Sequence, residues 1–566
     1  MFEGFTSLTS VTIGTSVKVI GEKAFAGTGL TNVTIPDNVI VIESSAFSPD
    51  VNADQTSSLK TVVIGNGVKL IDAKAFLNCD LLESVTLGTS VETIGDSAFS
   101  GCDKLTSIEM PNSVAIIGNS AFANSGLTSI EVGNNVKYIG NSAFNGCSQA
   151  TTVSIPNSVT TIGHNAFESC TKLESVDLGS GVKTIGSDAF ATCFKLTSFT
   201  VGDNVISFGY DVFRWVDNIT FNEYESGYYV GNETNKYVVF VKPTDENLTS
   251  ISLHANTKVI ANHAFDSCTS LITAELPSGL ITVGDYAFYQ CIELKTISIP
   301  DSVTSIGKNA FYGCKKMTTA TIGNGVKSVG NGAFDSCNNL TYNKTNNGCY
   351  LGNESNKYLV FVKPNFANTA STTSIDLNSN TKVLASGALY GYKNIIYVTL
   401  NDGLLTIGDS AFSECSAIIN LSIPSSVTTI GSSAFFRLRA LRYVTFLGES
   451  NLKTIGTSAF YQCDELDEII IPDSVETIGA NAFEACNDLE KVVIGSGVKY
   501  IGANAFLSSL NSSMLTNFTF KTTEGWFYNE SVNSTCGTEV SFEGLTSSQL
   551  RVFFLTTHVA KTWQRV

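Results

Sequence analysis

The segment LTSIEMPNSVAIIGNSAF, residues 105–122, decides the fold, because variants of it follow one another along most of the chain. In its first part the apolar residues Leu105, Ile108 and Met110 are separated by polar ones, which predicts a short strand with one face in the core and one in solvent. Pro111 ends the strand because proline has no amide hydrogen to donate to a sheet. The stretch therefore predicts one strand followed by a reversal of the chain.

The second half of the segment returns the chain. Val114 and Ile117 are expected to point inward, and Ala121 and Phe122 to lie on a short helical or irregular segment along the opposite face. A single coil of this size cannot bury these side chains, but neighbouring coils can cover them. The segment therefore predicts a stack, in which a change such as Phe311→Ala costs about 3 to 5 kcal/mol.

The position of Phe122 recurs along the chain, mostly in steps of 22 or 23 residues. Phenylalanine stands at 25, 47, 76, 99, 122, 144, 167, 190, 213, 265, 288, 311, 334, 412, 435, 460, 483 and 506, and Leu389 fills one further slot. A period of about 20 to 29 residues is typical of leucine-rich repeats. We predict an α/β solenoid, a leucine-rich-repeat superhelix of about nineteen coils with a parallel sheet on one face.

The segment SVTSIGKNAFYGC, residues 302–314, resembles the repeat of BspA-like leucine-rich-repeat proteins, and the match recurs over most of residues 1–510. The resemblance implies a surface or secreted protein of a bacterium or of a mucosal protozoan parasite. It also implies kinship with adhesins for host matrix proteins and cells. It does not identify a ligand, because the matching residues are the core ones.

Two similar inserts interrupt the period, GYYVGNETNKYVVFVKP (residues 227–243) and GCYLGNESNKYLVFVKP (residues 348–364). Each has two strand-like runs about a Gly-Asn-Glu turn, which predicts a hairpin. Each hairpin is either a spacer that continues the core or a ligand site. The ligand site would be built by Tyr228, Tyr229, Tyr237, Tyr350 and Tyr358.

The inserts divide the chain into six predicted parts. The repeat blocks are residues 1–221, 251–341 and 372–510, and the inserts are residues 222–250 and 342–371. Residues 511–566 lack the period and are expected to cap the exposed core, with a helix over Ser547–Lys561. A partner-binding helix is the alternative for that segment.

Charge and hydropathy exclude some classes of binding partner. The formal net charge is −17 without any block of like charges, so nucleic acid, which needs clustered Lys and Arg, is not an expected partner. No apolar run is long enough for a membrane span, and no secretory signal is visible. Because residues 1–8 read as the second half of a repeat, we expect a trimmed or mature chain from an extracellular or cell-surface protein.

Twelve of the fourteen cysteines follow the recurring phenylalanine, or its substitute, by three residues. Such regular spacing indicates a ladder of buried free thiols, since free cysteine behaves as a small apolar residue. Disulfides between adjacent coils are the alternative, although Ser125 interrupts the series. Cys349 and Cys536 lie outside the ladder, and their redox state stays open.

The sequence carries no recognisable catalytic set. The four histidines are scattered, and no His-Glu-x-x-His, Cys-x-x-Cys or Gly-x-Ser-x-Gly pattern occurs. Gly-x-Gly strings such as residues 179–181 and 323–325 recur as turns and lack phosphate-loop spacing. We therefore expect no enzyme, no metal site and no cofactor.

The remaining candidate surface is the solvent face of the sheet. Its candidate ligand-binding residues are Glu109, Glu131, Asp177, Glu275, Asp376, Tyr397, Tyr443, Glu468 and Lys491. The C-terminal third is the more aromatic and apolar part, which is typical of a protein interface. We expect an adhesin that binds a host or cell-surface protein, such as an extracellular matrix protein, or a glycan. The alternative is a self-associating surface-layer spacer.

Overall fold

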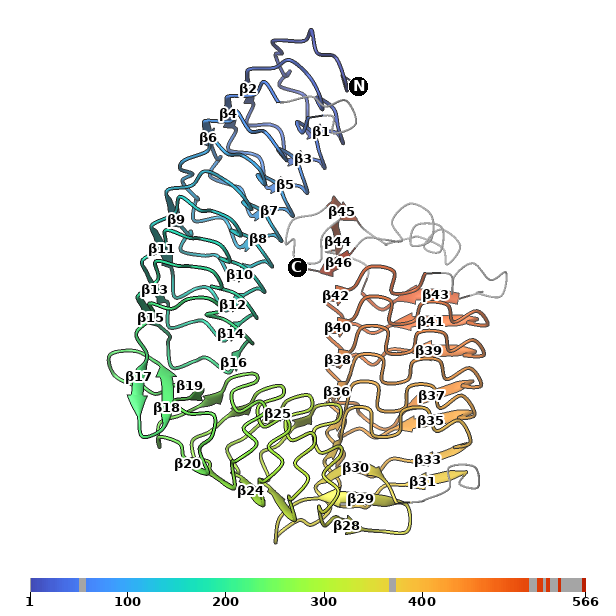
Figure 1. The fold of residues 1–566 in the computed structure, drawn as a ribbon. Coiled ribbons are helices and arrows are strands. Elements are labelled where there is room, and N and C mark those ends of the chain that lie inside the picture. Colours follow the sequence, from blue (N-terminus) through green and yellow to red (C-terminus); the bar gives the residue numbers. More distant parts are fainter. Residues whose placement is uncertain are drawn as a thin grey trace. The chain divides into compact units, whose positions relative to one another are not determined.

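The chain folds as stacked coils of strands and turns (Figure 1). The computed structural model describes residues 2–49, 57–365, 373–507, 517–522, 526–529, 538–540 and 562–565. Within them the chain forms two compact units, Met1–Val241 and the part that begins at Lys242. Among these residues no helix is long and apolar enough to cross a bilayer.

One strand of each regular coil belongs to a row of three- and four-residue strands, here called the long-strand row. In the first unit it consists of β2 (Asn32–Ile35), β4 (Thr61–Ile64), β6 (Ser84–Thr86), β9 (Ser129–Glu131), β11 (Thr152–Ile155), β13 (Ser175–Leu178) and β15 (Ser198–Thr200). In the second unit it consists of β20 (Ser250–Ser252), β22 (Thr273–Glu275), β24 (Thr296–Ile299), β26 (Thr319–Ile322), β31 (Ser374–Asp376), β33 (Tyr397–Thr399), β35 (Asn420–Ile423), β37 (Tyr443–Phe446), β39 (Glu468–Ile470), β41 (Lys491–Ile494) and β43 (Asn517–Phe520).

A second row is made of two-residue strands and is here called the short-strand row. In the first unit it consists of β1 (Val19–Ile20), β3 (Val41–Ile42), β5 (Leu70–Ile71), β7 (Thr93–Ile94), β8 (Ile116–Ile117), β10 (Tyr138–Ile139), β12 (Thr161–Ile162), β14 (Thr184–Ile185) and β16 (Ser207–Phe208). In the second unit it consists of β21 (Val259–Ile260), β23 (Thr282–Val283), β25 (Ser305–Ile306), β27 (Ser328–Val329), β32 (Val383–Leu384), β34 (Thr406–Ile407), β36 (Thr429–Ile430), β38 (Thr454–Ile455), β40 (Thr477–Ile478) and β42 (Tyr500–Ile501).

The sequence predicted one parallel sheet, on one face of the solenoid. The structure has two rows of parallel strands, so that prediction is incomplete. The short-strand row of the first unit is one ladder of parallel pairs from β1 to β16, whereas its long-strand row is broken into β2-β4-β6 and β9-β11-β13-β15. In the second unit the long-strand row is broken again, into β20 to β26, β31-β33 and β35 to β43. The Val-x-x-Ile half of the repeat thus forms the more continuous sheet.

The α/β class is wrong for the described residues, which contain no helix. The segment around nearly every core phenylalanine consists of turns because the residues two before and two after it have positive φ. Ser97 has φ 56° and Gly101 φ 70° on either side of Phe99. An α-helix needs φ near −63° at every residue, so these positions exclude one. The amides turn toward the next coil instead, as Phe99 N–H donates to the Ala121 carbonyl at 2.7 Å.

The core of each unit is a column of phenylalanine rings. Phe76 and Phe99 lie 5.2 Å apart with planes 4° apart, and in the second unit Phe288 and Phe311 lie 5.1 Å apart at 8°. All four rings are fully buried. The recurring phenylalanines therefore share a continuous interior within each unit, as the repeat predicts.

The two inserts form antiparallel strands. In the first, β17 (Asn222–Tyr224), β18 (Gly227–Val230) and β19 (Val239–Pro243) are neighbours in that order, and β17 pairs antiparallel with β18. In the second, β28 (Asn343–Lys344) and β30 (Val360–Pro364) both pair antiparallel with β29 (Gly348–Leu351). Asn353 holds the second turn in place, because its Nδ2 donates to the Ile322 carbonyl at 2.7 Å while its Oδ1 accepts the Ser355 and Asn356 amides.

The C-terminal part contributes three further strands, β44 (Trp526–Asn529), β45 (Thr538–Val540) and β46 (Thr562–Arg565). β46 pairs antiparallel with β42 and with β44, and Trp563 is buried. The edge of the short-strand row is thus covered at this end. The helix expected over Ser547–Lys561, and Cys536, lie outside the described residues.

Candidate binding site

The sheet-face residues predicted from the sequence fall into separate groups. In the first unit Glu131, Ser154 and Asp177 are successive partners across β9, β11 and β13, whereas Glu109 lies in a coil without a long strand. In the second unit Glu275 lies on β22 and Asp376 on β31. All five of these predicted acidic residues are exposed. They form no single cluster.

The C-terminal group is closer together. Tyr443, Glu468 and Lys491 are successive register partners on β37, β39 and β41, and Lys491 Nζ lies 3.0 Å from Glu468 Oε2. Tyr443 is 46% exposed, and Tyr397, two coils earlier, is 67% exposed. Aromatic rings of this exposure are available to a partner.

The five insert tyrosines do not all lie where the ligand-site hypothesis requires. Tyr229 and Tyr350 are completely buried, so they cannot contact a ligand, and that part of the hypothesis is wrong. Tyr229 packs edge-on against Phe240 at 5.2 Å, and Tyr350 packs against Phe361 in the same way. These two rings continue the aromatic core through the hairpins. The remaining three, Tyr228, Tyr237 and Tyr358, are half-buried.

The cysteine ladder belongs to the core as well. All thirteen cysteines in the described residues are free and buried. Ladder thiols donate to the carbonyl of the core phenylalanine one coil earlier, as Cys102 does to Phe76 at 3.4 Å and Cys486 to Phe460 at 3.2 Å. Burial raises the pKa of Cys193 to about 12. These thiols are structural, and protonated thiols are poor nucleophiles.

One coil of the second unit departs from the others at several positions. This divergent coil, FFRLRALRYVTFLGESNLKTIGTSA (residues 435–459), carries three of the six arginines of the chain. It has Leu438 at the ladder-cysteine position. The step from Phe435 to Phe460 is 25 residues, whereas the steps before and after it are 23. Sequence reasoning missed this coil, although the longer step and the arginines were visible signals.

The two added residues lie in the turn that ends β37. Five residues separate Leu421 from Val427 in the preceding coil, and seven separate Val444 from Leu452. The enlarged turn is bonded to the preceding coil, since Leu447 N–H donates to the Ile423 carbonyl at 2.9 Å and Asn451 N–H to the Ser425 carbonyl at 3.0 Å.

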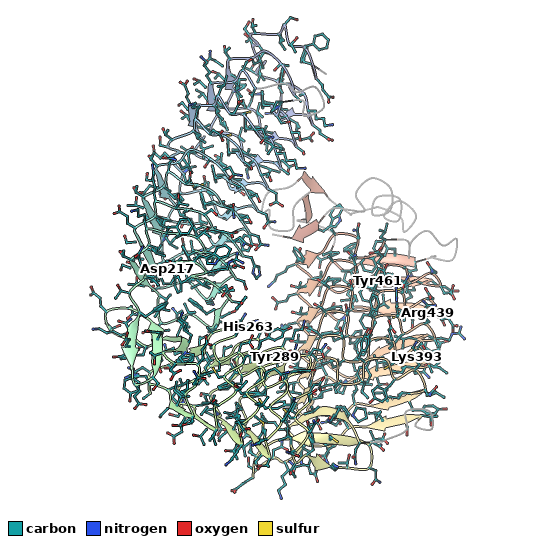
Figure 2. All side chains as sticks on the ribbon, in the orientation of Figure 1. Asp217, His263, Tyr289, Lys393, Arg439 and Tyr461 are labelled. Atoms are coloured by element: carbon teal, nitrogen blue, oxygen red, sulfur yellow. The ribbon has the colours of Figure 1, made fainter. Side chains whose placement is uncertain are left out.

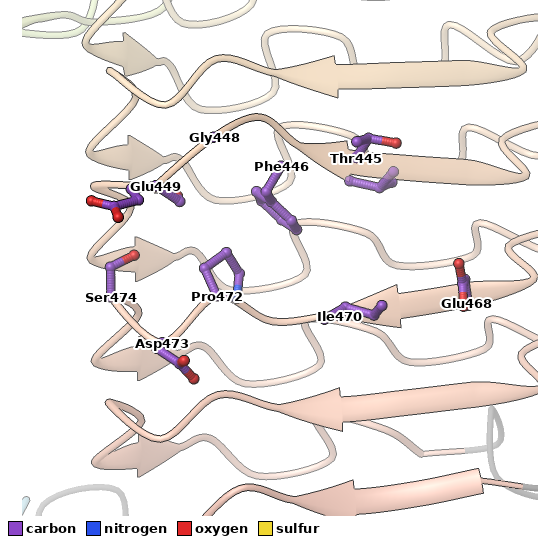
Figure 3. A pocket seen from close by; sticks show the side chains of 11 residues that line it. Thr445, Phe446, Gly448, Glu449, Glu468, Ile470, Pro472, Asp473 and Ser474 are labelled. Carbon is purple, nitrogen blue, oxygen red and sulfur yellow. The ribbon is translucent and has the colours of Figure 1, made fainter.

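The ladder opens on the other side of the enlarged turn. β37 pairs with β35 over four residues but with β39 only at Tyr443 and Glu468. Beyond that pair a hollow of about 480 Å³ lies between the two strands, here called the β37–β39 hollow (Figure 3). The enlarged turn and the separated ends of two neighbouring strands thus lie together at one place in the row.

The floor of the β37–β39 hollow is the core itself. Val444 and Phe446 are half-buried, although they stand at positions where the preceding coil has Leu421 and Ile423, each 1% exposed. In Figure 3 the Phe446 ring points into the space between the coils, toward Pro472. Ile470, 42% exposed, adds to the apolar lining.

Acidic and hydroxyl groups stand around this floor. Glu449, Glu468 and Asp473 line the hollow, which has no basic residue in its lining. The Ser496 amide and then Lys521 hold the pKa of Asp473 below its usual value, so it is ionised at neutral pH. Among the described residues no basic side chain lies within 4.0 Å of Glu449.

One buried hydroxyl at the hollow lacks a partner. Ser302 and Ser426 donate to carbonyls of the preceding coil, Leu280 at 2.6 Å and Leu404 at 2.7 Å. Ser474 stands at the same repeat position, but its buried Oγ makes no hydrogen bond among the described residues. A buried polar atom without a partner is unfavourable unless a ligand or water satisfies it.

The arginine edge of the divergent coil forms a second, smaller hollow of about 300 Å³, lined by Lys393, Glu414, Ser416, Arg437 and Arg439. Lys393, Arg439 and Tyr461 are labelled in Figure 2. Arg437 is held by Gln462 at 2.8 Å and lies over the Phe436 ring. Within the described residues no group of three or more His, Cys, Asp and Glu side chains is placed to hold a metal ion.

Comparison with known proteins identifies the family of the chain. The family model described as "BspA type Leucine rich repeat region (6 copies)" matches residues 1–126, 92–220, 240–358, 355–451 and 446–543. A search of curated proteins found no match.

Three similar solved structures are leucine-rich-repeat proteins or a bacterial antigen. The leucine-rich repeat protein of Bacteroides ovatus is 21% identical, with 87% of this chain and 92% of that one covered and a TM-score of 0.29. A leucine rich cell surface protein of Faecalibacterium prausnitzii is 25% identical. The match covers 55% of this chain and 86% of that one, with a TM-score of 0.30. The pneumococcal vaccine antigen PcpA is 22% identical. The match covers 68% of this chain and 91% of that one, with a TM-score of 0.26. The family model matches most of the chain, and the chain therefore belongs to the BspA-type leucine-rich-repeat family.

Proposed function

We propose that this protein is an adhesin of the cell surface or extracellular space that binds a host or cell-surface protein through the long-strand row of its second unit. Leucine-rich-repeat proteins of this type are generally non-enzymatic. Membership of this family is consistent with a protein-binding role at the surface. The observation that carries the proposal is the β37–β39 hollow, where core residues become accessible beside exposed tyrosines.

The surface around the hollow has the composition of an interface. Tyr397, Tyr443 and Ile470 are large and exposed, and the charged residues Glu468 and Lys491 follow Tyr443 in the register of the row. Interfaces are typically centred on a few aromatic anchors within a polar rim. Glu468 and Lys491 belong to that rim, with Asp376 and Glu275 farther along the same row. We keep Glu109, Glu131 and Asp177 as a secondary candidate patch in the first unit.

The experiment is a binding array of matrix proteins, cell-surface proteins and glycans probed with the intact chain. The array identifies a partner, and the double variant Tyr397→Ser/Tyr443→Ser should then weaken its binding by about tenfold or more. Tyr390→Ser is the matched control, since Tyr390 is 56% exposed on the turn side of the same unit. Equal binding by the double variant would contradict the assignment of the surface.

The size of the chain in solution tests the same proposal from another direction. A monomeric mass at all concentrations agrees with binding of a foreign partner. A mass that rises with concentration, and falls in the double tyrosine variant, would instead favour the self-associating spacer.

A further inference from the structure

The β37–β39 hollow has the lining that a basic side chain requires. An apolar floor of Val444, Phe446 and Ile470 suits the aliphatic stem of such a side chain. The carboxylates of Glu449 and Asp473 at one end of the hollow suit its charged end, Glu468 lies at the other end (Figure 3), and the Phe446 ring can lie against a guanidinium.

The charge balance of the hollow favours a cation over an anion. Two of its three carboxylates already have a lysine from a following coil, Lys491 for Glu468 and Lys521 for Asp473. Glu449 has none among the described residues, and it stands on the enlarged turn that lines the hollow. An added cation would complete the third pair, and the unpartnered Ser474 hydroxyl beside Glu449 in Figure 3 can accept a further donor hydrogen.

The backbone around the hollow favours an extended ligand. Both strands keep their outer neighbours, since β37 pairs with β35 and β39 with β41, but they separate from each other after one residue pair. Separated strand ends present peptide groups that a third extended segment can bond. Such a segment places alternate side chains on one side, so one can enter the hollow while its neighbours lie over Tyr443.

We propose that the β37–β39 hollow binds an arginine or lysine side chain on an extended, basic segment of the partner protein. The net charge of −17 draws such a segment toward the chain from a distance, and the hollow then selects its residues at contact. The inference rests on the proposed protein-binding function and gives the chemistry of the partner.

The test uses the full chain and a dye-labelled peptide, Ser-Val-Arg-Val-Arg-Val-Ser, followed by fluorescence polarisation. The control peptide has citrulline in place of each arginine, which keeps the shape and removes the charge. We expect the arginine peptide to bind about tenfold more tightly, with an affinity that falls as salt rises. Equal binding of the two peptides would overturn the proposal.

Three variants of the chain locate the binding. Glu449→Gln removes the unpaired carboxylate and should weaken binding about three- to tenfold. Deletion of Gly448 and Glu449 restores the 23-residue step, closes the hollow and should abolish binding. Glu22→Gln changes the net charge equally at an exposed site of the first unit and should leave binding unchanged. Binding that survives the deletion, or that falls equally in Glu22→Gln, would show a non-specific charge effect and overturn the proposal.

The two proposals fail in different ways. If the array partner needs Tyr397 and Tyr443 but ignores Glu449→Gln and the deletion, the proposed function stands and the basic ligand is wrong. If the arginine peptide binds in the hollow but no array partner depends on the tyrosines, the ligand chemistry stands and the adhesin proposal is wrong.

Discussion

The coil that begins at Phe483 and the divergent coil that begins at Phe435 share a core pattern but differ in what they expose. In the first, Val492 and Ile494 are fully buried within a ladder of three residue pairs to the preceding strand and four to the next. In the second, Val444 and Phe446 occupy the same positions and are half-buried. Leu441, Leu452 and Ile455, on either side, stay fully buried.

The difference teaches where a stack of repeats can acquire a binding site. The strand pair beside the two added residues is open, yet the phenylalanine column continues, since Phe435 and Phe460 still lie 5.0 Å apart. A coil contacts only its neighbours, so a local change of spacing remains local. Departures from the repeat are therefore better guides to function than its most regular residues.

The largest effect should come from breaking the regular column. Phe311→Ala removes a fully buried ring stacked on both sides, and should destabilise the second unit by about 3 to 5 kcal/mol. Phe446→Ala removes a half-buried ring and should cost about 1 kcal/mol. Denaturation midpoints of the two variants provide the measurement. A similar loss in both would mean that the divergent coil is packed like the others.

Alkaline pH should weaken the coils that carry a ladder thiol. Burial raises the pKa of Cys193 and of Cys415 to about 12, whereas the thiol of an unfolded chain ionises near 9. Above pH 9 the folded state therefore holds more protons than the unfolded state, so stability falls as pH rises. The loss is about 1.4 kcal/mol per thiol for each pH unit above 9.

Melting temperatures between pH 7 and pH 10 measure this loss. The double variant Cys193→Val/Cys415→Val should show a shallower decline than the parent, because valine does not ionise. The divergent coil has Leu438 in place of the thiol and should contribute nothing to the decline. A melting temperature that is constant up to pH 10 would show that the thiols are not buried as described.

Deleting Gly448 and Glu449 should convert the divergent coil into a regular one. The restored ladder between β37 and β39 would add about two backbone hydrogen bonds, each stabilising by about 1 kcal/mol. Amide hydrogen exchange over residues 443–450 and 468–472 should become slower. Exchange that stays fast, or becomes faster, would show that something other than the added residues holds the strands apart.

The smallest effect concerns ion pairs across coils. Lys491 and Glu468 lie beside the opening at 3.0 Å, and Lys316 and Glu293 connect two regular coils at 2.8 Å. Both pairs are solvated, so double-mutant cycles should give about 0.2 to 1 kcal/mol for each, decreasing with salt. A clearly larger coupling for Lys491 and Glu468 would show that the hollow shields its charges from solvent.

Much of the fold could be predicted because the same pattern of core residues recurs in almost every coil. The phenylalanine positions, the alternation of the long strands and the buried thiols follow from spacing and apolar character alone. The short-strand row could not be predicted in this way, since two-residue strands such as Thr93–Ile94 are too short to show a period. Nor could the turns around Phe99, because Ser97 has no special preference for positive φ.

The candidate site was predicted only in part. Exposed Tyr397 and Tyr443 were identified because a large aromatic at a solvent-facing strand position departs from the repeat. Tyr229 and Tyr350 were misplaced because an aromatic run in a hairpin reads the same whether its rings face solvent or the core. The hollow was missed because it depends on which neighbouring coil the enlarged turn bonds to.

The sequence by itself determined that successive coils must stack, because no single coil can bury its own phenylalanine and only a neighbour with the same spacing can cover it. It also determined which residues are in the core. Only the tertiary structure decided that the enlarged turn bonds to the coil before it and separates from the coil after it. That choice depends on hydrogen bonds between residues one repeat apart, such as Asn451 with Ser425, and local sequence patterns do not encode such bonds.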